Sequence, residues 1–226
     1  LQTYPDHLKA LEALERVSLR GETSEQESFY QQVIQLPSKE HLYPLQLRAI
    51  AALQKTKNSS LLEQSDQLAE ELHKEHPRDP ALLNLLCISQ ERSGVLPGQR
   101  AETLEQLAHY EKDPQQSRLH LLEAARLFAG PAKMPERAIR CWRNVLEHAP
   151  HDSETWEALQ RCCIEQEQWD ELLSLLQEPT ARRYRIDQPT LVLQLVEAIH
   201  NQQLPEIDPR PFLFQAFSNN PQHTDV

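Results

Sequence analysis

Hydrophobic residues recur at intervals of three and four along most of this chain, which is the spacing of one face of an α-helix. The pattern is clearest over residues 135–176, where it occurs in three consecutive segments. Its members are Ala138, Trp142, Val145, Trp156, Leu159, Cys163, Trp169, Leu172 and Leu176. The stretch 149–152, which contains a proline, separates the first two segments. The pattern therefore predicts consecutive helices that share one continuous apolar stripe.

Signals for helix starts repeat at a nearly constant interval. Aspartate accepts hydrogen bonds from the free amides of a first turn, and proline fits the first helical position. Such starts fall at Asp79, Asp113, Asp152 and Asp187, which stand 34, 39 and 35 residues apart. A repeat of that length holds two helices, so the chain is predicted to form about six antiparallel helical hairpins.

Other local signals place further helices. Residues 5–20 are predicted to form the first helix, with Leu8, Leu11, Leu14 and Val17 facing inward. Capping boxes, in which a serine and a glutamate three residues later satisfy free amides, are expected at two helix starts. They are Ser24 with Glu27 and Ser60 with Glu63.

Composition favours an all-α fold. The chain of 226 residues has only four glycines, all in gaps between periodic segments, and its 16 prolines cluster at the same boundaries. Residues 94–98 are accordingly predicted to be a loop before a helix at residues 101–110. β-Branched and aromatic residues are too scattered to form alternating strands.

Six residues of the clearest stretch carry a resemblance to a known repeat family. They are Ala138, Trp142, Val145 and Pro150, which fit a second repeat helix, and Trp156 and Leu159, which open the next unit. In these positions the stretch resembles the tetratricopeptide repeat (TPR). The resemblance implies a right-handed α–α superhelix, or solenoid, that binds other proteins. We expect a single TPR-like domain over residues 1–219 and a disordered tail over residues 220–226.

The family's template assigns candidate partner-binding residues to the first helix of each hairpin. Its groove position lies five residues after the template aromatic, which is counted from Tyr43, Leu121 and Trp156. The positions reached are Arg48, Arg126 and Arg161. Counting from Asp113 would instead place Ser117 at the aromatic position of its hairpin, so two registers are open there.

These arginines suit a protein partner, because a guanidinium is a planar fork of donors that binds carboxylates in pairs. Asn84 and Glu157 complete the candidate set, and Asn84 suits a peptide backbone. The alternative is that the arginines pair with nearby acids such as Glu123 and Glu157 and only aid solubility. The lysine and asparagine set of the family's carboxylate clamp is not reproduced, so chaperone tails are not implied as partners.

Charge and motif content exclude several classes of function. The net charge of −11 argues against nucleic acid as the main partner. No phosphate loop, nucleophile elbow or zinc-protease signature occurs, so no enzymatic activity and no cofactor are expected. The pairs His73 with His76 and His148 with His151 have a spacing that zinc could use, but helix ends explain them better.

The cysteines and the apolar runs of the chain give an indication of its cellular location. The four cysteines lack metal spacing and are expected to be buried and reduced. No apolar run reaches the length of about twenty residues that a membrane helix needs, so no membrane insertion is expected. We therefore expect a cytoplasmic protein.

The sequence predicts a non-enzymatic scaffold or adaptor that binds another protein or a peptide segment in the concave groove of its solenoid. A second hypothesis is a structural subunit of an assembly or secretion apparatus that self-associates through its terminal helices. The C-terminal helix motivates it, because a homo-oligomer could bury the aromatic residues Phe212, Phe214 and Phe217. A third hypothesis is a chaperone of secreted substrates that uses the same groove.

Overall fold

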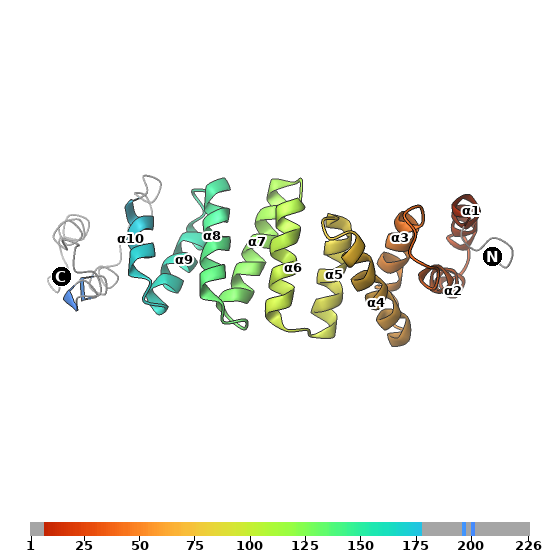
Figure 1. Cartoon of the computed structure of the whole chain (residues 1–226), viewed down its shortest axis with the longest axis horizontal. Helices are drawn as coiled ribbons and strands as arrows, with labels where there is room; N and C mark the ends of the chain where they lie inside the picture. The colour runs from red at the N-terminus through yellow and green to blue at the C-terminus, as the bar shows by residue number, and fades with distance from the viewer. Residues whose placement is uncertain (1–6, 178–195, 198–199, 202–226) are drawn as a thin grey trace. The chain divides into compact units, whose positions relative to one another are not determined.

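The structure is a computed structural model, and it describes residues 7–177, 196–197 and 200–201. Within residues 7–177 the chain forms ten α-helices joined by short loops (Figure 1). They are α1 (Leu8–Ser18), α2 (Thr23–Ile34), α3 (Tyr43–Leu53), α4 (Ser59–Glu75), α5 (Pro80–Ser93), α6 (Pro97–Tyr110), α7 (Pro114–Ala129), α8 (Pro135–His148), α9 (Ser153–Glu165) and α10 (Trp169–Gln177). The described residues contain no strand, and the predicted all-α fold class is confirmed.

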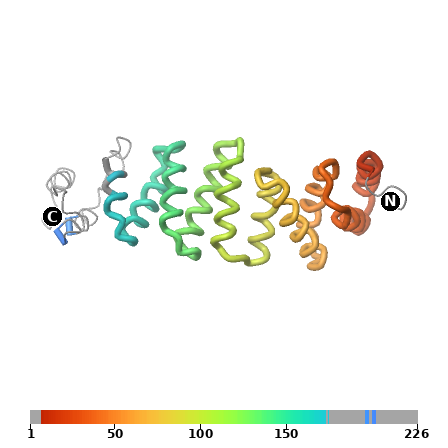
Figure 2. Tube along the Cα trace, viewed as in Figure 1, coloured from red at the N-terminus to blue at the C-terminus, as the bar shows by residue number. Residues whose placement is uncertain are grey.

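The chain divides into two compact units, Leu1–Ala124 and Ala125–Val226, and the division falls within α7. In the first unit each helix from α1 to α6 contacts the next, α2 also contacts α4, and α3 also contacts α5. In the second unit α9 contacts both α8 and α10. The trace reverses direction from helix to helix (Figure 2). Contacts of each described helix with the next, and in places with the next but one, are typical of a solenoid of helical hairpins, as predicted.

Several sequence predictions fall outside the described residues. They are the sixth hairpin, the helix with Phe212, Phe214 and Phe217, and the tail over residues 220–226. The structure divides into two compact units, and the single domain expected over residues 1–219 stays a prediction.

Aspartate starts two of the helices as predicted. The Asp79 carboxylate accepts hydrogen bonds from the amides of Ala81 at 2.8 Å and Leu82 at 3.4 Å. Asp113 accepts from the amide of Gln115 at 3.0 Å. Asp152 precedes α9 but binds a side chain instead, accepting from the hydroxyl of Thr155 at 2.9 Å.

The two predicted capping boxes are wrong. Helix α2 begins at Thr23, one residue before the predicted serine cap, and its N-cap Glu22 makes no side-chain cap hydrogen bond. Helix α4 is capped by Asn58, whose side chain accepts from the amides of Ser60 and Leu61. Asparagine is an equally good cap, and its earlier position moves the helix start upstream of the serine.

The loop predicted over residues 94–98 is shorter than expected. Gly94 ends α5 in the left-handed conformation at φ 65°, where glycine has no Cβ to strain. Pro97 then takes the first position of α6, so Gly98 lies inside the helix. The proline is already in the helical range of φ, which explains the early start.

The apolar stripe of the clearest stretch is buried from Ala138 to Cys163 and at Leu172, as predicted, whereas Trp169 is half-buried. Trp156 is 1% exposed and Trp142 is 5% exposed, and Leu159 and Cys163 are fully buried. The register of α7 is also decided, because Leu121 is buried whereas Ser117 uses its hydroxyl to cap the carbonyl of Ala108.

Two residues predicted to face inward from the first helix are exposed. Leu14 is 41% exposed and Val17 is 68% exposed, whereas Leu11 and Glu15 are the buried residues of α1. The spacing of three that linked the four apolar residues drifts around a helix of 3.6 residues per turn, so its last members leave the buried face. None of the helices in the described part of the chain has the length and apolar character to cross a membrane.

Replacing a buried leucine of α5 tests the packing of the first unit. Leu83 is fully buried, so Leu83→Ala is expected to lower the free energy of unfolding by about 2–5 kcal/mol, measured by urea denaturation. Leu96→Ala is the matched control, since Leu96 is 71% exposed, and it should change that free energy by about 0.5 kcal/mol or less. Equal losses in the two variants would contradict the assigned packing.

Candidate functional site

The odd-numbered helices share one exposed register position. In α7 and α9, buried residues fall at the same relative positions, Leu121, Ala124 and Phe128 in one and Trp156, Leu159 and Cys163 in the other. The residue five positions after the first member is exposed in both helices, and it is Arg126 or Arg161. The same count from Tyr43 in α3 reaches the exposed Arg48. Burial therefore supports the template register from which these arginines were chosen.

The sequence argument missed one residue of this series. Counting five positions from the buried Leu83 in α5 reaches Ile88, which is 43% exposed. Asn84 was chosen instead, and it is also exposed, one turn before Ile88 on the same side of the helix. Glu157 and Arg161 form the equivalent pair in α9. The count that found the arginines would have found Ile88 had it been applied to this helix.

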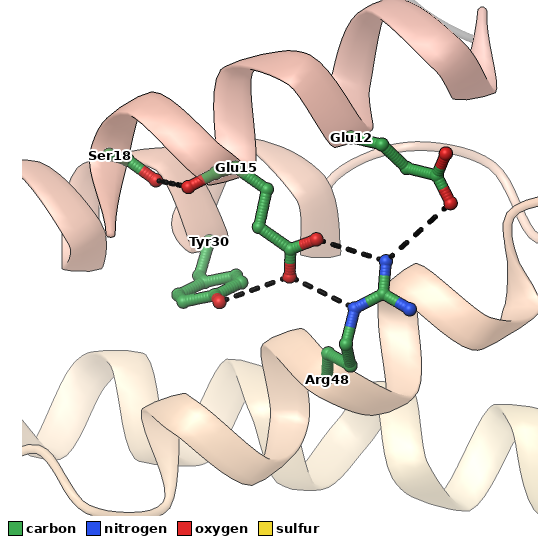
Figure 3. A network of polar contacts seen from close by, with 5 residues as sticks. All are labelled: Glu12, Glu15, Ser18, Tyr30 and Arg48. Atoms are coloured by element: carbon green, nitrogen blue, oxygen red, sulfur yellow. Dashed lines mark hydrogen bonds and ion pairs between the residues drawn. The ribbon is translucent and has the colours of Figure 1, made fainter. Parts of the chain in front are cut away.

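Arg48 is engaged within the protein (Figure 3). Its Nε and Nη2 atoms donate to the two carboxylate oxygens of Glu15 on α1, each at 3.0 Å. Glu12, one turn away on α1, lies 4.0 Å from the same Nη2. The pKa of Arg48 is raised above its ordinary value, mainly because its guanidinium donates hydrogen bonds to Glu15. For this arginine the alternative interpretation holds, because it pairs with acids of its own chain.

Tyr30 of α2 completes the network around Glu15. Its hydroxyl donates to Glu15 Oε1 at 3.1 Å, and Glu15 is only 7% exposed (Figure 3). Burial, helped by the charge of the Glu15 carboxylate, raises the pKa of Tyr30 from 10.0 to about 12. One carboxylate thus joins three helices, and its acceptors are satisfied by two different side chains. The role of this network is structural.

Arg126 and Arg161 differ from Arg48. Both are exposed, and the side chain of neither makes a hydrogen bond or ion pair with another residue of the described part of the chain. Glu123, an acid considered as their partner, pairs with Arg100 instead. The other acid, Glu157, also has no such contact with described residues. Two guanidinium groups with all their donors available are therefore presented at equivalent positions of α7 and α9.

The cysteines provide no reactive site. All four are free and buried, which confirms the prediction of buried thiols. Burial raises the pKa of both Cys87 and Cys163 to about 12, so these thiols stay protonated at neutral pH. In the described residues no group of three or more potential metal ligands comes together. His76 instead packs against the ring of Tyr43, with ring centroids 4.0 Å apart.

The structural role of Arg48 can be tested by substitution. Arg48→Ala leaves the buried Glu15 carboxylate without its cation, so the free energy of unfolding should fall by about 1–3 kcal/mol. In a double-mutant cycle with Glu15→Gln, the two losses should not add, and a coupling of about 0.5 kcal/mol or more is expected. Arg161→Ala serves as the control without a stability change. Additive effects in the cycle would contradict the assigned pair.

The raised pKa of Tyr30 predicts a loss of stability at high pH. Between about pH 10 and pH 12 the unfolded chain ionises this tyrosine while the folded chain keeps it neutral, so the free energy of unfolding falls. Tyr30→Phe should remove this contribution and flatten the pH dependence, measured by urea midpoints across this range. An unchanged slope in the variant would show that Tyr30 does not titrate in this way.

Comparison with protein families identifies the family of this chain. The family model of the ChAPs, described as Chs5p-Arf1p-binding proteins, matches residues 10–206. No curated protein matches the chain. The matched family is one of protein-binding adaptors with helical repeats, and the match spans nearly all of the described helices. This chain therefore belongs to the ChAPs family, the Chs5p-Arf1p-binding proteins.

Proposed function

We propose that this chain is a non-enzymatic adaptor that binds an extended or helical segment of a partner protein along the exposed face of its odd-numbered helices. In TPR-like solenoids this face lines the concave groove, and we propose that the hairpins here are TPR-like in the same sense. Membership of a family of Chs5p-Arf1p-binding proteins supports a protein partner. Proteins related to Chs5p or Arf1p are the first partners to test.

The observation that carries the proposal is the pair Arg126 and Arg161. Both occupy the same register position, both are exposed, and both keep their donors free of other described residues. A partner carboxylate can accept two parallel hydrogen bonds from each guanidinium, which fixes its position as well as adding energy. Acidic residues spaced along the partner segment would therefore be recognised. Glu157, one turn before Arg161, gives a place for a cation of the partner.

Asn84 and Ile88 extend the same kind of surface to α5. An amide that offers both a donor and an acceptor suits a peptide backbone, and an exposed isoleucine one turn later suits an apolar side chain. Arg48 is excluded from our proposed contact set, because binding a partner carboxylate would require it to leave the buried Glu15. The location that we propose is cytoplasmic, supported by four free cysteines without a disulfide, which is usual in a reducing compartment.

Charge reversal of the two arginines tests this function. Affinity capture from the native source identifies the partner, and calorimetry with the purified partner then measures the dissociation constant. Arg126→Glu combined with Arg161→Glu should weaken binding by at least about tenfold, because attraction is replaced by repulsion at two contacts. Lys57→Glu combined with Lys112→Glu makes the same change of net charge on exposed loop residues and should bind normally. Full affinity in the arginine variant would show that the proposed face is not the binding site.

A further inference from the structure

Helix α1 has a second apolar stripe that none of the described residues covers. Ala10, Ala13, Leu14 and Val17 are all exposed and follow the spacing of one helix face. They lie away from the buried side of the helix, where Leu11 is fully buried and Glu15 is held by Tyr30 and Arg48. Exposed apolar side chains that share one face of a helix are typical of a contact surface.

Three cations border the stripe on one side. Lys9 and Arg16 stand seven residues apart on one edge of α1, and Arg20 follows in the turn after the helix. All three are exposed, and their side chains make no hydrogen bond or ion pair with any described residue. Of the acids of the helix, Glu15 pairs with Arg48 at 3.0 Å, and Glu12, one turn from Lys9 and from Arg16, lies 4.0 Å from the same guanidinium. Three cations without a described partner thus stand along this edge, in a chain whose net charge is −11.

The neighbouring hairpin shows what such a helix face normally contacts. Helix α3, the equivalent helix of the next hairpin, contacts α2 on one side and both α4 and α5 on the other. Helix α1 packs on α2 and reaches α3 through Arg48, and its stripe has no helix against it within the described residues. The alanines Ala10 and Ala13 leave room for another helix to approach closely.

We propose that the apolar stripe of α1 and its basic edge form a docking surface for an acidic amphipathic helix of a partner polypeptide. The apolar face of that helix would cover Leu14 and Val17, and its carboxylates would pair with Lys9, Arg16 and Arg20. This surface is separate from the arginines of α7 and α9, so the inference does not depend on the proposed function.

Two other occupants fit the surface less well. A lipid surface would favour bulky and aromatic side chains, whereas the stripe consists of two alanines, one leucine and one valine. In a second copy packed antiparallel about a two-fold axis, the basic edges of the two helices would lie side by side and repel. An acidic helix satisfies both the apolar stripe and the three cations.

A pair of synthetic peptides tests the proposal on the full chain. The first is a helical peptide with an alanine and leucine face flanked by glutamates, and the second replaces those glutamates with lysines. Fluorescence anisotropy should show the acidic peptide binding at least about tenfold more tightly than the basic one. The preference should weaken as added salt shortens the Debye length from about 30 Å to about 3 Å.

Variants of α1 locate the binding. Lys9→Glu, Arg16→Glu and Arg20→Glu together, or Leu14→Glu with Val17→Glu, should each abolish the preference for the acidic peptide. All five side chains are exposed or face solvent, so circular dichroism should be unchanged. A triple variant with Lys55→Glu, Lys57→Glu and Lys112→Glu carries the same charge change in loops and should bind as the wild type does. The double variant of Arg126 and Arg161 should also bind this peptide normally, which separates the two proposals.

Three outcomes would overturn the proposal. The first is equal binding of both peptides, or binding that the α1 variants leave intact. The second is that vesicles of phosphatidylserine and phosphatidylcholine bind through α1 while the peptides do not, which would make the surface a lipid contact. The third is a concentration-dependent dimer in sedimentation that the same variants dissociate, which would make the occupant a second copy.

Discussion

Every helix of this protein must bury its apolar stripe against helices that are close to it in sequence. A stack of hairpins has no central core, so stability is gained at each interface between neighbours. Helices inside the stack, such as α3 and α5, are covered on both sides and are apolar around much of their surface. Among the described helices α1 packs mainly against α2, and it buries only Leu11 and Glu15. The number of neighbouring helices therefore decides how many apolar residues of each helix are buried.

The same constraint explains the charged network near α1. Because it buries little apolar surface, this helix is attached in part by a carboxylate that accepts from side chains of two other helices. A buried carboxylate is costly unless its hydrogen bonds are satisfied, so Glu15 depends on Tyr30 and Arg48 together. Attachment through polar contacts fixes the orientation of α1, and this orientation turns Leu14 and Val17 outward. The same register position thus holds an arginine paired with an acid in α3 and arginines without a described partner in α7 and α9.

Much of the fold could be predicted from residues alone. The aspartates at 79 and 113, the glycine at 94 and the stripe around Trp156 gave correct helices, because caps and periodicity act within a few residues. The errors also have local causes, since Asn58 took the cap position expected for a serine and Pro97 started α6 early. The candidate site was found in part, because exposure at one register position follows from helix geometry. Which of the exposed arginines pairs with an acid could not be predicted in this way.

What the sequence by itself determined is the class of the molecule: its helical hairpins, their mid-thirties period and the register that exposes Arg48, Arg126 and Arg161. What only the tertiary structure decided is which of these arginines is free. Arg48 is 33 residues from Glu15 in the chain and yet lies 3.0 Å from it. The side chains of Arg126 and Arg161 make no ion pair with an acid among the described residues. Pairing between side chains that are distant in sequence depends on how neighbouring helices are oriented, and no local pattern encodes that orientation.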